Sequence, residues 1–227
     1  MAIAFSHFGS NAATSGSVAA TVTINAGDTV VVLIMCDASN ARTVSTVVDS
    51  SGTNTYAQKV NLTNSNSCQA FLWGSLNVGS SATSVTVTMS GTYLNLDVVV
   101  LTYTGVGTNG FGSTNTASGA AAGSQTVTLT TQDANNFIVG GFMGHNTTGT
   151  WTFSIAGGNL RTQKAATNGS NFDGVGGVDE LIVSAGLGTI GTTSSRNLTW
   201  VGLVAELRST NISSGAADLR TLMGVGT

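Results

Sequence analysis

The chain has 227 residues, of which only 7% are Asp, Glu, Lys or Arg, and its formal net charge is −3. Soluble domains usually carry about a quarter charged residues, so solubility here must rest on Ser, Thr, Asn and Gly. The charge is too small and too scattered to attract nucleic acid, and no run of Lys or Arg offers phosphate contacts. No segment approaches the ~20 apolar residues of a membrane helix. Nucleic acid and membrane are therefore not expected partners.

The first 24 residues have no basic start and no apolar stretch long enough for a signal peptide. We therefore expect synthesis and folding in a cytoplasm, where thiols stay reduced. The two cysteines, Cys36 and Cys68, both lie in apolar runs that are typical of strands. The sequence predicts two buried free thiols rather than a disulfide.

Thirty glycines, no proline and short runs of Val, Ile and Thr between Gly, Ser and Asn are typical of an all-β protein. Alternating apolar residues predict a half-exposed strand at 18–24, and a nearly continuous apolar run predicts a strand buried on both faces at 29–35. Further strands are expected in the first half at 68–76, 84–89 and 94–103.

A turn-rich segment separates two short strand-like runs, 43–48 and 56–60. Their spacing predicts a hairpin with Gly52 or Asn54 at positive φ. From Asp49 onward, oxygen-bearing side chains occur at every second position, as at the start of a calcium-binding loop, but no later Glu supplies the bidentate ligand. We interpret Asp49 as the start of an Asx turn.

The second half of the chain repeats the order of the first, which is typical of an internal duplication. The matching stretches are SVAATVTI at 17–24 with SQTVTLT at 124–130, GDTVVVLIMC at 27–36 with NNFIVGGFMG at 135–144, and NTYAQKV at 54–60 with GNLRTQKA at 158–165. This alignment pairs Lys59 with Lys164.

Each half supplies about five or six strands, which cannot bury both of their faces alone. We predict one two-sheet antiparallel β-sandwich of jelly-roll type, with an internal pseudo-repeat and almost no helix. Residues 1–208 would form this single domain, with pseudo-halves 1–106 and 124–208, and residues 209–227 a C-terminal extension or arm. The alternative is two small sandwiches. The Gly-, Ser-, Thr- and Ala-rich segment 106–123 would then be their linker, whereas a jelly roll would use it as a crossover.

No catalytic motif is recognisable in the ionisable residues. Neither His7 nor His145 lies in a nucleophile elbow or a metal-binding helix, and we interpret His145 as a loop histidine. Asp173, Asp179 and Glu180 form the only local acidic cluster. We interpret it as a solvated strand edge, because Asp179 and Glu180 would point to opposite faces of a strand. The sequence predicts no enzymatic activity, no cofactor and no metal site.

Aromatic rings could provide a platform for a sugar. Trp73 and Trp200 lie in apolar strand-like runs and are expected in the core. Trp151, in the Thr-rich stretch NTTGTWTFSIAGG, is the ring most expected to be exposed. Trp151 and the nearby Asn146 are therefore the candidate glycan contacts.

Several stretches resemble a β-sandwich module, jelly-roll-like in form, of tailed-phage virion proteins. They are INAGDTVVVLIMCDAS at 24–39, VVDSSGTNTYAQ at 47–58, FLWGSLNVGSSATSVTVTMSG at 71–91, VVVLTYTGV at 98–106 and WVGLVAELR at 200–208. Such modules occur in capsid decoration proteins, fibres and tail appendages, and no catalytic residues come with the family. The chain departs from the family in its turns, where relatives often carry prolines and this sequence has none.

The resemblance implies a virion structural protein made in the cytoplasm of a host bacterium. The leading expectation is a decoration or cement protein on the capsid surface, which stabilises the shell by binding across capsid subunits. Its expected partners are the major capsid protein and copies of itself, in a homotrimer. The alternative is a tail-fibre or adhesin-type module that binds host surface glycans through Trp151 and Asn146.

The last residues, 209–227, have no counterpart in the first half. Within them Leu219, Leu222, Met223 and Val225 place four sizeable apolar side chains in seven residues. This density is unusual for a solvated end and favours an arm that contacts a partner. The alternative interpretation is a frayed tail.

Overall fold

The computed structural model describes residues 2–37, 42–64, 68–91, 95–168 and 171–209. Within these ranges the chain forms antiparallel strands and no helix, so the prediction of an all-β sandwich protein is confirmed. No helix in the described ranges is long and apolar enough to cross a membrane.

The first half contains eight strands in two sheets. They are β1 (Ala4–Ala13), β2 (Ser17–Ile24), β3 (Thr29–Cys36), β4 (Val44–Asp49), β5 (Ala57–Asn64), β6 (Cys68–Ser75), β7 (Ala82–Met89) and β8 (Leu96–Thr104). A five-stranded sheet has the order β1-β8-β3-β6-β5, and a three-stranded sheet has the order β2-β7-β4. Strand β2 buries every second side chain, as its alternation predicts, whereas β3 is buried along its whole length.

The second half contains six strands in one sheet. They are β9 (Val106–Thr131), β10 (Asn136–Asn146), β11 (Phe153–Gly157), β12 (Asn159–Asn168), β13 (Asn171–Ile182) and β14 (Gly186–Ser209). The long strands β9 and β14 each contribute to two layers. In one layer, the start of β9 pairs with the end of β14, and the end of β14 pairs on its other side with β10. In the other layer, the end of β9 pairs with the start of β14, and the start of β14 pairs on its other side with β11.

The two halves therefore have the same strand order. The inner layer of the second half runs from the start of β9 through the end of β14 to β10, β13 and β12, and this order matches β1-β8-β3-β6-β5. Its outer layer, formed by the end of β9, the start of β14 and β11, matches β2-β7-β4. The sequence repeat is thus a repeat of structure. The strands lie in three sheets rather than two, because each half forms its own pair of layers.

Two local predictions were wrong. Residues 106–123 are neither a linker nor a crossover, because they form the first part of β9, which corresponds to β1. The segments 43–48 and 56–60 do not form a hairpin, because β4 pairs with β7 in the outer sheet and β5 pairs with β6 in the inner one. Gly52 does take the predicted positive φ, at 69°.

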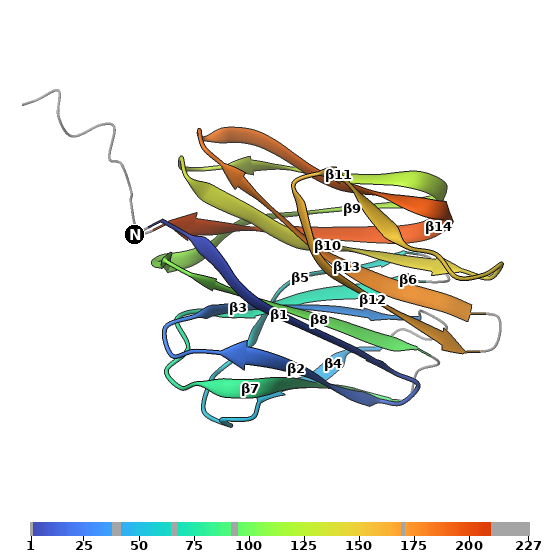
Figure 1. The fold of residues 1–227 in the computed structure, drawn as a ribbon, viewed down its shortest axis with the longest axis horizontal. Helices are drawn as coiled ribbons and strands as arrows, with labels where there is room; N and C mark the ends of the chain where they lie inside the picture. The colour runs from blue at the N-terminus through green and yellow to red at the C-terminus, as the bar shows by residue number, and fades with distance from the viewer. Residues whose placement is uncertain (1, 38–41, 65–67, 92–94, 169–170, 210–227) are drawn as a thin grey trace, which may run out of the picture.

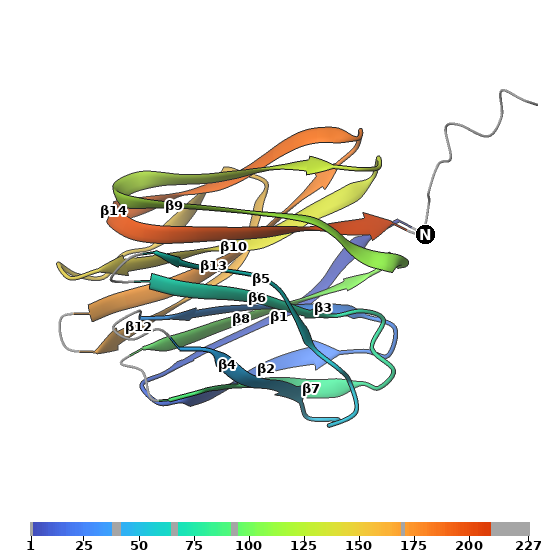
Figure 2. The same cartoon turned by 180° about the vertical axis from the view of Figure 1, so that it is seen from behind.

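Three hydrophobic cores separate the layers. One lies between the two sheets of the first half, a second lies between the two inner layers, and the third lies within the second half. Figures 1 and 2 show the outer sheet β2-β7-β4 at one end of this stack and β11 with its neighbours at the other. We call the halves the first and second sandwiches, and the contact between their inner layers the joint.

The joint has an approximate two-fold symmetry. Strand β5 carries a bulge between Gln58 and Val60, and β12 carries the corresponding bulge between Leu160 and Thr162. The bulges make Arg161, and not Lys164, the structural counterpart of Lys59. The sequence alignment was three residues out of register there, because Gln-Lys occurs in both segments.

Candidate functional site

The two bulge residues cross the joint and cover aromatic rings of the opposite sandwich. The Lys59 Nζ atom lies 4.6 Å from the ring centroid of Phe111, and the Arg161 Cζ atom lies 4.3 Å from that of Phe5. Contacts of this kind contribute about 0.5–2 kcal/mol, more when water is excluded. Gly74 makes room for one ring, because a Cβ atom there would lie 2.2 Å from the Phe111 ring.

A buried carboxylate strengthens one side of the joint. Asp179 on β13 is fully buried, and its Oδ2 atom accepts hydrogen bonds from the Tyr103 hydroxyl at 2.8 Å and from Arg161 Nε at 2.7 Å. Asn159 donates to Oδ1 at 3.2 Å. Burial and the Asp179 charge raise the pKa of Tyr103, so its hydroxyl remains a donor. These bonds compensate the cost of removing the carboxylate from water.

A second carboxylate is held by a different pair of residues. Asp173 is fully buried, accepts a hydrogen bond from Asn95 and lies 2.5 Å from Nδ1 of His145. The hydrogen bond with Asp173 raises the pKa of His145, although burial opposes this. His145 is therefore a strand residue with a structural partner, not a loop histidine. The prediction of a solvated acidic edge was wrong for Asp173 and Asp179, because β13 lies between β10 and β12 and faces the first sandwich.

Asp97 is the most unusual ionisable group of the joint. It is fully buried on β8, and neither carboxyl oxygen has a hydrogen-bond partner among the described residues. Burial raises its pKa well above the usual range, the Asp173 charge adds to this effect, and Lys164 opposes it. Asp97 therefore retains a proton at pH values where an exposed aspartate has lost it. A charged residue in the apolar run LDVVVL was the sequence signal for such a group.

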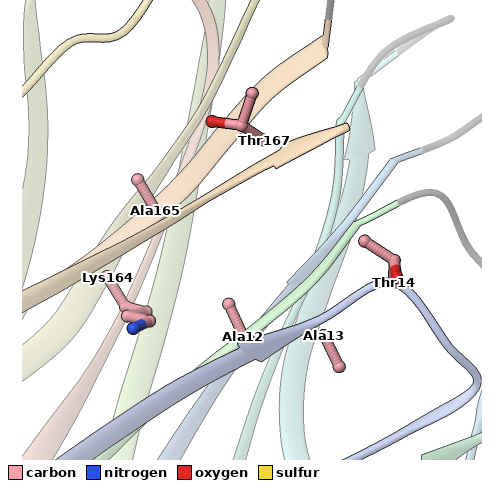
Figure 3. Close-up of a pocket in the computed structure, with 6 residues that line it drawn as sticks. All are labelled: Ala12, Ala13, Thr14, Lys164, Ala165 and Thr167. Atoms are coloured by element: carbon pink, nitrogen blue, oxygen red, sulfur yellow. The ribbon is translucent and has the colours of Figure 1, made fainter. Parts of the chain in front are cut away.

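A shallow pocket opens at the edge of the joint where β1 ends beside β12. Its volume is about 360 Å³, and Figure 3 shows Lys164 as the charged residue among those drawn. The other lining residues are small: Ala12, Ala13, Thr14, Ala165 and Thr167. One lysine and two hydroxyls among alanines offer too few directed groups to define a ligand.

The remaining polar candidates have structural partners. The Oδ1 atom of Asp49 accepts hydrogen bonds from the backbone and hydroxyl of Ser51, and its Oδ2 atom accepts them from Asn54 and Tyr56. This is the predicted Asx turn. Within the described ranges, no group of three or more His, Cys, Asp and Glu side chains could hold a metal ion. On β1, Nδ1 of His7 lies 2.7 Å from the hydroxyl of its neighbour Ser6.

The candidate glycan contacts do not form an exposed platform. Trp151 is only 6% exposed, packs edge-on against Phe153 and donates its Nε1 proton to the carbonyl of Phe172, so the expectation that it is exposed was wrong. A Thr-rich sequence surrounds a ring that covers the third core. Asn146 uses its amide in bonds to Asn197 and Thr148. Trp200 lies in the core as predicted.

Two further predictions have different outcomes. Cys36 and Cys68 are both buried thiols, as predicted. They lie in different cores, on opposite faces of the five-stranded sheet. The proposed arm residues Leu219, Leu222, Met223 and Val225 lie outside the described residues, so their role stays a prediction.

The geometry is that of an internal interface rather than of a recognisable catalytic centre. Its charges join two sandwiches, and Tyr103 meets Asp179, as Asn95 meets Asp173, only because the repeats pack face to face. No protein-family model, no curated protein and no solved structure matches this chain.

Proposed function

We propose that this protein is a structural component of a tailed-phage virion. In this proposal it is a decoration or cement protein that assembles as a homotrimer on the capsid surface. It would bind across subunits of the major capsid protein and stabilise the shell by burying area that exists only after assembly. Binding alone would provide this function, without cofactor or catalysis.

The observation that carries the proposal is the lack of charge on both outer layers. The six strand segments that form them contain a single ionisable residue, Asp49, and it is buried. The exposed positions of β2 and β4 are small, hydroxyl-bearing or aliphatic: Ser17, Ala19, Thr21, Thr23, Ser45, Thr46 and Val48. Removing hydroxyls from water costs far less than removing charges. Such faces suit lasting contact with another protein.

The joint supports the same role. It connects the sandwiches through a shared apolar core, two cation–ring contacts and the buried Asp179 network. A block that keeps its shape loses little conformational freedom when it docks. Its two uncharged faces lie at opposite ends of the stack (Figure 1), so one copy could contact two neighbours.

Copy number per virion tests the location. Mass spectrometry of purified particles should find hundreds of copies, and capsids that lack the protein should lose heat resistance. A handful of copies confined to the tail would overturn the capsid assignment.

A charge placed on one outer layer tests the docking face. Thr21→Lys should weaken binding to capsids that lack the protein at least tenfold, because the new charge must be removed from water on docking. Thr108→Lys is the matched control at an exposed position of β9 outside the outer layers, and it should bind as the unsubstituted protein does. Equal binding by all three proteins would contradict docking through β2.

A further inference from the structure

The joint is held unevenly along its length. One residue, Gly105, connects β8 of the first sandwich to β9 of the second, and its φ is 74°. The hydrogen bond between Tyr103 and Asp179 lies beside this connection, because Tyr103 is two residues from Gly105. Both cation–ring contacts lie at the same end, since Phe5 pairs with Tyr103 and Phe111 pairs near the end of β14. We call this the connected end of the joint.

The opposite end, which we call the acidic end, contains one buried carboxyl group from each sandwich. Asp97 is seven residues before Thr104, the last residue of β8, so about 23 Å separates it from the connection. Asp97 faces the joint, because Val99, two residues further along, belongs to the core between the inner layers. Asp173 of β13 reaches the same part of β8, where it accepts a hydrogen bond from Asn95, two residues before Asp97.

The two carboxyl groups differ in their partners. Asp173 is bonded to Asn95 and His145, whereas neither carboxyl oxygen of Asp97 has a partner among the described residues. Lys164 on β12 is near enough to act on Asp97, yet it forms no ion pair in the described ranges. An ionised Asp97 in this arrangement is a buried charge without a hydrogen-bond donor, close to a carboxylate of the other sandwich. Such a charge is very costly unless water reaches it.

We propose that the joint is a pH-sensitive hinge, which opens at the acidic end when Asp97 loses its proton. The two sandwiches turn about Gly105, because a short connecting segment is where hinge motion is absorbed. Opening separates Asp97 from Asp173 and lets water hydrate both carboxylates. The pocket at this end gives water a route, since it is lined by Ala12 of the first sandwich and Lys164 of the second (Figure 3). The inference concerns the free protein and does not depend on the proposed virion role.

Raising the pH favours the open form. Burial and, after it, the Asp173 charge raise the pKa of Asp97 in the closed form above the ordinary value of 3.8, to which a hydrated carboxyl group returns. The closed form therefore binds the Asp97 proton more tightly, and it loses stability relative to the open form as the pH rises. His145 acts in the same direction, because its hydrogen bond with Asp173 raises its pKa and a neutral imidazole leaves the Asp173 charge uncompensated.

The remaining ionisable groups at the acidic end come from three other elements. Lys164 on β12 opposes opening, because its charge favours the ionised carboxylate in the closed form. Asp37, which follows β3, adds to the effect of Asp173 on the pKa of His145 and so supports opening at higher pH. Cys68 on β6 keeps its proton, since burial raises the pKa of its thiol well above the usual range. Lys164 is therefore the one group of this set that holds the acidic end closed at high pH.

Spin labels on the two sides of the pocket test the motion. Thr14 of the first sandwich and Thr167 of the second both line the pocket and are exposed, so Thr14→Cys with Thr167→Cys places one nitroxide on each sandwich. Labels are attached at low pH, where Cys36 and Cys68 are buried. Dipolar broadening of the electron paramagnetic resonance spectrum should decrease from about pH 5 to about pH 9 as the labels move apart. Asp97→Asn cannot ionise, and in this variant the broadening should stay at its low-pH value.

A second pair of labels tests the position of the hinge. Ala57 of β5 pairs with Gly74, and the ring of Phe111 packs on Gly74 from the other side of the joint, two residues after Asn109. Ala57 and Asn109 are both exposed, and Ala57→Cys with Asn109→Cys should give the same broadening at every pH. Broadening at the pocket that never changes with pH, or that is lost in Asp97→Asn as well, would overturn the inference. Loss of broadening at both pairs together would show global unfolding instead of hinge motion and would also overturn it.

Discussion

Arg161 of the second sandwich lies over the Phe5 ring of the first, with 4.3 Å between the guanidinium carbon and the ring centroid. Lys59 and Phe111 make the corresponding contact in the opposite direction. Phe5 pairs with Tyr103 and Phe111 pairs with Leu207, so the two rings occupy equivalent places in their sandwiches. One chain thus contains an interface of the kind that two-fold dimers form, in which each contact occurs twice.

The two cations should differ in their contribution to stability. Arg161→Met removes a ring contact and also the ion pair with buried Asp179, and we expect the free energy of unfolding to fall by about 3 kcal/mol. Lys59→Met removes only a ring contact, so a loss of about 1 kcal/mol is expected. Urea unfolding followed by tryptophan fluorescence measures both, and equal losses would contradict the role assigned to Asp179.

The Tyr103 hydroxyl should stabilise the joint through Asp179. Tyr103→Phe should lower the free energy of unfolding by about 2 kcal/mol, because a buried carboxylate loses a donor. In an Asp179→Asn background the same substitution should cost about 1 kcal/mol or less, since the acceptor is then neutral. A double-mutant cycle by urea unfolding measures this coupling, and purely additive losses would show that the bond contributes nothing of its own.

Stability should fall as pH rises because of Asp97. The pKa of Asp97 is raised in the folded state above the ordinary value of 3.8. The contribution of protonated Asp97 to the free energy of unfolding is therefore complete below pH 3.8 and is lost as pH rises toward the raised pKa. Asp97→Asn cannot ionise. We expect its advantage in thermal unfolding to grow from near zero at about pH 4 to a clear increase in Tm at about pH 8.

His145 provides the control for this profile. Its pKa is raised above 6.5 by Asp173, so it also stabilises the fold at lower pH and loses this effect as pH rises through the raised value. His145→Gln should reduce the slope above about pH 6.5 and leave the part below it unchanged. A Tm for Asp97→Asn that follows the unsubstituted protein at every pH would contradict a protonated Asp97, on which the charges of Asp173 and Lys164 act.

The two thiols should be unreactive in the native protein. Cys36 and Cys68 have no exposed surface, and burial raises the pKa of Cys68 well above its usual range. Labelling by a disulfide reagent should therefore require unfolding and release two equivalents only in denaturant. Rapid labelling of either thiol without denaturant would indicate that the sheet opens locally.

The sequence predicted strands well because their signal is local. Strand β2 alternates since one of its faces is buried, and β3 is continuously apolar since both are. The repeat was detectable for the same reason. The pairing partner of each strand could not be predicted from the sequence. A turn such as the one after Asp49 does not determine whether the chain returns to its own sheet or crosses to another. This ambiguity produced the false hairpin between β4 and β5.

The candidate site was harder to predict, because its residues become neighbours only at the joint. Asp179 was assigned to solvent on the basis that carboxylates are rarely buried, and its partner Tyr103 lies 76 residues away. Trp151 was expected to be exposed because its neighbours are polar, yet the ring covers the third core. The isolated charges of Asp97 and Glu206 in apolar runs were the available signals of buried ionisable groups.

Because two related sandwiches are joined in one chain, equivalent positions on the two sides of their interface can carry different residues. In a two-fold dimer every substitution appears twice, so a second carboxylate would have to be buried with the first. Here Asp97 faces the joint once, and the corresponding position in β14, counted from the equivalent Tyr103 and Leu207, is the apolar Val201. Asp173 likewise corresponds to Cys68, counted from the equivalent bulges. Each surface of the joint thus carries chemistry that a two-fold dimer would have to carry in pairs.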